Sequence, residues 1–346
     1  MAVSILEEEI FQQPSVVRRV LEKEINNARK IVARLQGTFS YVVIAARGSS
    51  DNAARYAQYL FGAHNQFQVA LATPSLFTLY QNPPSLKHAL IIGISQSGQS
   101  PDIVAVLEEG RKQGRPTLAI VNETNSPLAQ TADFVVPLHA DHERAVAATK
   151  TYTASLVVLA MLSCLMEENE QHLDQLKSMP ELMQRTLEET VKQLPHVERY
   201  RYMDRCTVIG RGYNYATAFE IALKIKELSR VLADPYSSAD FRHGPIAVIH
   251  QGYPVILAAP RGAVSTDITD LVTALKKLGS EQVIISDDGL LLEQANLGLP
   301  LPTKVPEWLT PLLAVLPGQL FALELTRNKG LDPDHPAGLT KVTETL

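Results

Sequence analysis

Cysteine is scarce in this sequence of 346 residues, where only Cys164 and Cys206 occur. Each stands among apolar residues, which favours buried, unpaired thiols over a disulfide framework. His-Glu-x-x-His motifs, paired Cys-x-x-Cys motifs and acidic calcium loops are all missing, so we expect no metal centre. A Gly-x-Gly-x-x-Gly fingerprint is also missing after the candidate strands, which argues against a dinucleotide. We therefore expect chemistry that needs no cofactor.

The sequence also lacks a basic stripe, and we expect neither a leader segment nor a run that spans a membrane. Its formal net charge of -5 argues against a nucleic-acid partner. The first residues become acidic at once, and the most apolar run, residues 154–165, is too short to span a bilayer. We expect no membrane partner and a cytoplasmic protein. A hydrophobic content of 45% and the chain length predict two globular domains with sizeable cores.

The first half alternates short β-branched runs with amphipathic stretches after an initial helix. Residues 3–35 have helix-like apolar spacing, with Pro14 as an interruption. Because the strands are continuously apolar and separated by helices, they predict a parallel sheet covered on both faces. The five expected strands are residues 41–45, 69–71, 90–94, 117–121 and 134–137.

The second half repeats this pattern after a long helical stretch that is broken at Pro180. The segment Val43–Gly48 aligns with Thr207–Gly212, and both end in Arg-Gly before a helix, which predicts a duplicated α/β module. The strands expected here are residues 206–210, 255–259, 282–285 and 299–301, with a helix at 215–231. The predicted organisation is a helical segment at 1–35, a first domain at 36–170, a helical linker at 171–195 and a second domain at 196–346.

A serine-rich turn follows the third predicted strand. Hydroxyls occur at Ser95, Ser97 and Ser100, and Gly98 lets the backbone curl around a ligand. We expect Ser100 to cap the next helix, which starts at Pro101, so that amide N–H groups and the helix dipole attract an anion. A capped polar loop without a ligand is the alternative that spacing alone leaves open.

Several motifs together resemble the sugar isomerase (SIS) family, whose usual phosphate turn is Ser-Gln-Ser-Gly-Glu-Thr. Nearly the whole chain resembles the isomerase half of glucosamine-6-phosphate synthase, without the glutaminase domain and its nucleophilic cysteine. The likeness is closest to stand-alone SIS-type glucosamine-6-phosphate deaminases. It implies two tandem SIS modules, each a five-stranded, flavodoxin-like three-layer sandwich. The matching segments are residues 47–50, 95–100, 145–150, 220–227, 237–245 and 336–346.

Three charged residues on the helix at 215–231 are candidates for acid–base chemistry. Glu220, Lys224 and Glu227 are spaced i, i+4 and i+7, so they share one face of an otherwise apolar helix. A salt-bridged surface stripe is the alternative, but the apolar neighbours favour a row that faces a cleft. The resemblance makes Glu227 the base that moves a proton between C1 and C2, Lys224 a sugar contact and Glu220 structural.

The resemblance also assigns residues outside that helix. It makes His243 the ring-opening group, supplied across a homodimer interface, and Lys341 a residue that forms an imine or lies beside the site. It places Glu143, Thr149 and Lys150 at the sugar end of the pocket. Arg144 and Ala148 depart from the synthase pattern there. The implied phosphate contacts are Ser50, Ser95, Gln96, Ser97 and Ser100, and the implied sugar contacts are Gly48, Ala147, Lys224 and Thr340.

These assignments predict deamination of glucosamine 6-phosphate to fructose 6-phosphate and ammonia. A deglycase acting on a fructosamine 6-phosphate and an ammonia-dependent synthase are the alternatives within the same enzyme class. A phosphosugar-sensing regulator is a further alternative, although the first residues are too few and too acidic for a DNA-binding helix-turn-helix.

Overall fold

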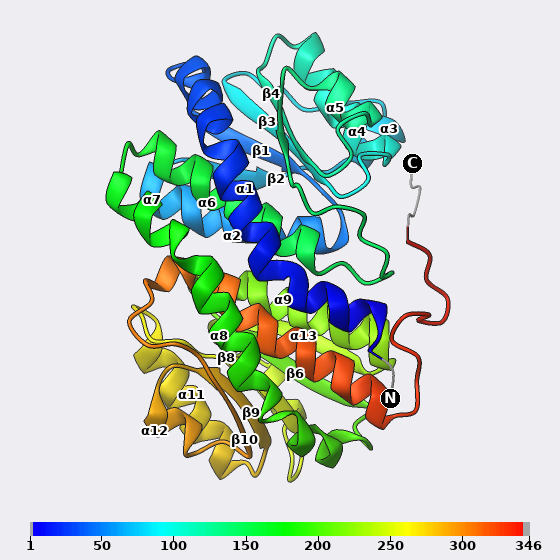
Figure 1. The fold of residues 1–346 in the computed structure, drawn as a ribbon, viewed down its shortest axis with the longest axis vertical. Helices are drawn as coiled ribbons and strands as arrows, with labels where there is room; N and C mark the ends of the chain where they lie inside the picture. Colours follow the sequence, from blue (N-terminus) through cyan, green and yellow to red (C-terminus); the bar gives the residue numbers. More distant parts are fainter. Residues whose placement is uncertain (1–2, 342–346) are drawn as a thin grey trace. The chain divides into compact units, whose positions relative to one another are not determined.

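A computed structural model describes residues 3–341 and divides the chain into two compact units. Of the described residues, the N-terminal module contains 15–143, 150–178, 340 and 341. The C-terminal module contains 3–14, 144–149 and 179–339. Each module is built on one five-stranded, wholly parallel sheet (Figure 1).

The N-terminal sheet has the strand order β2-β1-β3-β4-β5, the flavodoxin-like order that the resemblance implied. The expected strands are confirmed within one or two residues because each is a nearly continuous apolar run. One face of the sheet packs on α4 (Pro101–Lys112) and α5 (Pro127–Thr131), through a core that includes Ile91, Ile103 and Leu107. The strands are β1 (Tyr41–Ala45), β2 (Gln68–Leu71), β3 (Ala89–Ser95), β4 (Thr117–Val121) and β5 (Phe134–Pro137).

Helices cover both faces of this sheet, as expected for parallel strands. α6 is buried along almost its whole length, from Lys150 to Leu165, and packs against α2. The helices of this module are α2 (Gly48–Asn65), α3 (Ser75–Thr78), α4 (Pro101–Lys112), α5 (Pro127–Thr131), α6 (Lys150–Met166) and α7 (Glu170–Lys177).

The C-terminal sheet repeats the topology, with the order β10-β9-β8-β6-β7. Strand β7 was not expected from the sequence, and Pro235 lies inside it. Within residues 3–341, β7 is an edge strand that pairs only with β6, and proline is tolerated at an edge because one side of the strand needs no donor. The strands are β6 (Arg205–Gly210), β7 (Leu232–Ser237), β8 (Pro254–Ala258), β9 (Glu281–Ser286) and β10 (Leu297–Pro300).

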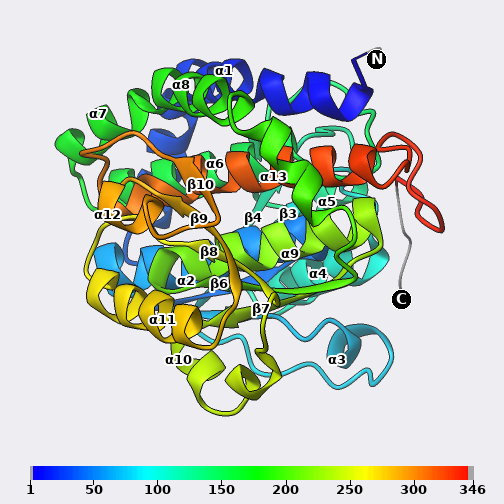
Figure 2. The same ribbon diagram turned by 90° about the horizontal axis from the view of Figure 1, so that it is seen from below.

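Figure 2 shows α11 on one side of this sheet and α13 on the other, with α9 next to α13. The two helices approach closely at Gly318, where an added Cβ would lie 2.3 Å from the Ile221 side chain. The helices are α8 (Met179–Val191), α9 (Tyr215–Ser229), α10 (Ser238–Arg242), α11 (Ser265–Lys277), α12 (Gly289–Leu292) and α13 (Thr310–Asn328). Short 3-10 turns are η1 (Leu194–Tyr200), η2 (Gly212–Asn214), η3 (Pro245–Val248) and η4 (Glu307–Leu309).

Within residues 3–341, one helical stretch, Glu307–Asn328, has the length and apolar character of a membrane span. The protein buries 94% of its most apolar window, as expected for a core helix. This stretch was not predicted from the sequence, because a helix buried on all sides has no amphipathic period.

Helix α1 (Ile5–Leu35) runs without a break through Pro14, so the expected interruption is wrong. Proline removes the N–H that the carbonyl of Ile10 would accept from. The side-chain amide of Gln13 donates to that carbonyl instead, at 2.9 Å. The same nitrogen also lies 2.7 Å from Oε1 of Gln319. The lost backbone bond is thus replaced locally.

Candidate active site

The serine turn connects β3 to α4 at the carboxyl edge of the N-terminal sheet, where open α/β sheets bind ligands. The hydroxyl of Ser95 accepts from the N–H of Gly98 at 2.9 Å, and that of Ser97 accepts from Gln99 at 3.3 Å. Ser100 occupies the N-cap position, but its hydroxyl makes no capping bond, contrary to expectation. Among the described residues, its hydroxyl and the Ser97 N–H remain available to an oxyanion.

Gly98 allows the turn to curl tightly. Its φ is +64°, a region that side chains with a Cβ rarely adopt. An added Cβ would lie 2.1 Å from the hydroxyl oxygen of Ser126, the N-cap of α5. The Gly98 carbonyl accepts from the N–H of Leu128 at 3.1 Å, which ties the turn to α5. The expected need for glycine here is explained by both conformation and space.

Arg47, at the end of β1, forms an ion pair beside the serine turn. Nε and Nη2 of Arg47 donate to Oδ2 of Asp102 at 2.9 and 2.7 Å. Asp102 lies in the first turn of α4 and is fully buried, so its charge would oppose a nearby phosphate if Arg47 did not neutralise it. Since β1 and β3 are neighbours in register, Gly48 and Ser50 lie at the strand end adjacent to the turn.

A second cluster of polar side chains in this module includes Lys341, the last residue that the structure describes. Nζ of Lys341 lies 2.9 Å from Oε2 of Glu143, whose side chain is fully buried. The same carboxylate accepts from the N–H and hydroxyl of Thr151 at 3.1 and 2.9 Å. Thr340 precedes Lys341 and is exposed, and Nζ of Lys150 donates to the carbonyl of His142 at 3.1 Å. An amine that attacks a carbonyl must be neutral, so imine formation requires Lys341 to leave this ion pair.

The charged row on α9 lies in the C-terminal module and is largely internal. Glu220 and Lys224 are 0% and 1% exposed, whereas the Glu227 side chain is 22% exposed. Nζ of Lys224 lies 2.5 Å from Oε2 of Glu227 and 3.6 Å from Oε1 of Glu220. The row is therefore not a surface stripe. One buried ammonium links two carboxylates, of which only Glu227 reaches solvent.

The other expected residues of this module lie on separate segments. His243 follows α10 and is exposed, with its backbone N–H bonded to the carbonyl of Asp240. The part of the chain that the structure describes shows no hydrogen bond or ion pair between the His243 and Glu227 side chains. Ala147 is buried in the short segment 144–149, where the N–H of Arg144 donates to Glu9 at 2.6 Å.

The Arg47–Asp102 arrangement recurs in the C-terminal module. Arg211, at the end of β6, lies 2.8 Å from Asp267 in the first turn of α11. Ser238 and Arg242 also bind the Asp267 carboxylate. Burial alone would raise the pKa of Asp267, but hydrogen bonds from Ser238, Arg211 and Arg242 outweigh it and hold the pKa below its ordinary value.

The turn between β8 and α11 corresponds to the serine turn but contains no serine before α11 begins at Ser265. Its Ala263 N–H donates to Oε2 of Glu307 at 2.7 Å. The Glu307 carboxylate therefore accepts the N–H that a bound phosphate would need. The features that favour anion binding are thus found in the N-terminal module.

Asp102, Ser126 and Asp267 were not identified from the sequence. The one available signal was the repeated Arg-Gly at residues 47–48 and 211–212, because an arginine placed alike in two modules suggests a partner placed alike. Cys164 and Cys206 are both unpaired and buried, as expected.

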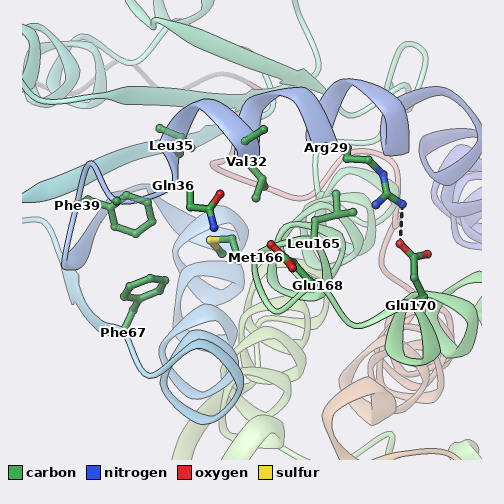
Figure 3. Close-up of a pocket in the computed structure, with 12 residues that line it drawn as sticks. Arg29, Val32, Leu35, Gln36, Phe39, Phe67, Leu165, Met166, Glu168 and Glu170 are labelled. Atoms are coloured by element: carbon green, nitrogen blue, oxygen red, sulfur yellow. Dashed lines mark hydrogen bonds and ion pairs between the residues drawn. The ribbon is translucent and has the colours of Figure 1, made fainter.

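A separate cavity of about 330 Å³ lies at the opposite edge of the N-terminal sheet (Figure 3). Phe39 and Phe67, which just precede β1 and β2, pack against each other in a tilted arrangement at one end of it, with ring centroids 4.8 Å apart. The Arg29–Glu170 ion pair lies at the other end. None of the expected site residues lines it.

Comparison with known proteins connects these features to a family. The SIS domain family model matches residues 40–164 and 201–327, one match in each module. The chain therefore belongs to the SIS domain family.

The chain is also similar to one group of SIS proteins over nearly its whole length. It is 33% identical over 338 residues to the isomerizing glutamine–fructose-6-phosphate aminotransferase of Pyrococcus horikoshii, covering 96% of this chain and 56% of that protein. It is 33% identical over 336 residues to the same enzyme of Aquifex aeolicus, with the same coverage. The chain thus spans little more than half the length of these relatives.

Solved structures confirm the expected architecture. The C-terminal domain of glucosamine-fructose-6-phosphate aminotransferase from Francisella tularensis superposes with a TM-score of 0.88 at 24% identity, covering 97% of this chain and 99% of that chain. Glucosamine-6-phosphate deaminase from Thermotoga maritima superposes with a TM-score of 0.80 at 20% identity, covering 99% of this chain and all of that chain. Both structures share the two-module SIS architecture of this chain.

Proposed function

We propose that the protein deaminates glucosamine 6-phosphate to fructose 6-phosphate and ammonia. The serine turn and Ser50 bind the phosphate, with Gln96 beside them, while Gly48, Ala147, Lys224 and Thr340 contact the sugar. His243 opens the ring by moving a proton between the ring oxygen and the C1 hydroxyl. These roles follow the SIS family resemblance, residue by residue.

In the open chain, Glu227 takes the C2 proton and returns it to C1, so the C1 aldehyde becomes an alcohol and C2 becomes an imine. Water then adds to C2, and the carbinolamine expels ammonia to leave the ketone of fructose 6-phosphate. Proton transfer by a placed carboxylate contributes about 10²–10⁴-fold to the rate. Binding of the phosphate also holds the sugar in the orientation that the reaction needs, which contributes further to the rate.

The observation that carries this proposal is the contact between Glu227 and Lys224. A buried ammonium at 2.5 Å fixes the orientation of the one carboxylate of the row that reaches solvent. A regulator that only senses a phosphosugar needs the serine turn but has no use for a buried lysine that orients a partly exposed carboxylate.

The curated relatives favour a second candidate, the same conversion run from fructose 6-phosphate and ammonia towards glucosamine 6-phosphate. Both directions use the same proton transfer, so the site residues do not distinguish them. A fructosamine-6-phosphate deglycase shares the same steps with a larger amine.

The test is to incubate the protein with glucosamine 6-phosphate and measure ammonia and fructose 6-phosphate together. The proposal predicts equal amounts of both. Activity confined to a 6-phosphofructosamine of an amino acid would replace the deaminase with the deglycase. Binding of these sugars without turnover would replace it with a sensor.

We further propose a homodimer in which His243 acts in the partner's site. Support comes from the exposure of His243 and of Val248, which is 51% exposed in the following turn. The test is to co-express Glu227→Gln and His243→Ala chains. If His243 acts across the interface, mixed dimers regain one intact site, and random assembly restores about a quarter of the wild-type activity. If each chain uses its own His243, no activity returns.

A further inference from the structure

Three potential metal ligands meet in the N-terminal module, away from the serine turn. His64 lies in the last turn of α2, Glu167 directly follows α6, and His172 lies in α7. Figure 1 shows these three helices side by side. The side chains of His64, Glu167 and His172 are 13%, 27% and 25% exposed. The cluster is therefore partly shielded and partly accessible to solvent.

The donor atoms lie close enough together for one first-row transition-metal ion to reach all three after small side-chain movements. Nδ1 of His172 and Nδ1 of His64 lie 2.8 and 3.4 Å from the same oxygen, Oε2 of Glu167. The ligand atoms of all three residues lie within 4.8 Å of one another. Tetrahedral zinc, with bonds of about 2.0–2.2 Å, places its ligands about 3.3–3.6 Å apart. Small side-chain rotations around the ion would bring the three donors to that spacing.

Neighbouring contacts hold the three segments in place. Asn65, next to His64, donates to the carbonyl of Ser163 at 3.0 Å and accepts from the Ser163 hydroxyl at 2.7 Å, which ties α2 to α6. Asn169 caps α7 by accepting from the N–H of His172 at 3.1 Å. A site whose ligands are already positioned loses little conformational entropy on binding an ion.

We propose that His64, Glu167 and His172 bind Zn²⁺, with water as the fourth ligand. Two imidazoles and one carboxylate suit zinc better than magnesium or calcium, which prefer oxygen ligands. The ion links the end of α2, the residue after α6 and α7, so its role is to stabilise the module. No single stretch of sequence contains these ligands, and so the sequence motifs did not predict the site.

The rival is a cluster held only by hydrogen bonds from the two imidazoles to Glu167. Isothermal titration of the chelator-treated full chain with Zn²⁺, followed by Co²⁺ absorption spectroscopy, separates the two. The site predicts one tight Zn²⁺ per chain, a visible tetrahedral Co²⁺ spectrum and a higher Tm with zinc. His172→Gln and Glu167→Gln each lower the Zn²⁺ affinity by at least about 100-fold.

Glu167→Gln retains an oxygen that accepts an imidazole N–H, so it separates loss of the metal from loss of the hydrogen bonds. His335→Gln is the matched control, because exposed His335 pairs with Asp332 at 2.9 Å and offers a cation only two ligands. This control keeps the affinity and the spectrum. Absence of tight zinc binding in the wild type, or equal binding by Glu167→Gln, would overturn the proposal. Neither outcome bears on the sugar-phosphate chemistry.

Discussion

The guanidinium of Arg47 donates two hydrogen bonds to one oxygen of the buried Asp102 carboxylate. The pair joins the end of β1 to the first turn of α4, directly beside the serine turn. Arg211 and Asp267 repeat the pair in the C-terminal module. An arginine–aspartate ion pair at the same point of both sheets supports the duplication that the paired Arg-Gly segments indicated.

Replacing Arg47 should lower the stability of the protein more than replacing Asp102. Arg47→Leu leaves a fully buried carboxylate without its cation, whereas Asp102→Asn leaves an arginine whose side chain is 52% exposed to water. We expect Arg47→Leu to cost about 1–3 kcal/mol of stability and Asp102→Asn less. Urea unfolding of both variants measures this. An equal or larger loss for Asp102→Asn would show that the buried charge does not depend on Arg47.

Gly98→Ala tests the curl of the serine turn. The new Cβ would meet the hydroxyl of Ser126 at 2.1 Å and would sit at a φ of +64°. We expect a stability loss of about 1–3 kcal/mol and weaker sugar-phosphate binding by calorimetry. Gly114→Ala is the control, because its φ is +68° but nothing lies within 4 Å of the added atom. If both variants bind the sugar phosphate like the wild type, the shape of the turn does not matter for phosphate binding.

The Asp267 cluster predicts a pH dependence of stability. Because the folded-state pKa of Asp267 is lowered, the stabilisation is complete above the unfolded-state pKa of about 3.9. It is lost as the pH falls below that value towards the folded pKa. Melting temperatures between about pH 3 and 6 should therefore fall less steeply for Asp267→Asn than for the wild type. Exposed Asp270→Asn, on the same helix, should retain the wild-type slope. Identical slopes for all three proteins would show that Asp267 makes no such contribution.

The two cysteines should be inert in the folded protein. Burial is the main cause that raises the pKa of both the Cys164 and the Cys206 thiol to about 12, so little thiolate forms near neutral pH. A thiol-specific chromogenic reagent at pH 8 should therefore react only after denaturant is added. Rapid reaction of the native protein would contradict this burial.

Continuous apolar strands were predicted well from the sequence, because such runs are typical of parallel sheets whose two faces are covered. The predictions were wrong where tertiary context overrode a local rule. Pro235 is tolerated in β7 because that strand is at the edge, and Pro14 is tolerated in α1 because the Gln13 amide replaces the lost donor. α13 was overlooked because burial on all sides erases its periodicity.

The residues of the candidate site were likewise predicted only in part from the sequence. The serine turn and the row on α9 were visible because each lies within one stretch of sequence. The partners Asp102 and Ser126 lie on other elements, and a single sequence does not show that the fold brings them to Arg47 and Gly98. The family resemblance supplied the roles of His243 and Lys341, and their chemistry stays a prediction.

The most direct test of the central claim compares the wild type with Glu227→Gln and Glu220→Gln on glucosamine 6-phosphate, measuring ammonia and fructose 6-phosphate together. We predict equal release of both by the wild type and a fall of kcat by about 10²–10⁴-fold in Glu227→Gln. Glu220→Gln should lower stability rather than abolish turnover, since Glu220 is fully buried. Full turnover by Glu227→Gln, or no product from the wild type, would contradict the account.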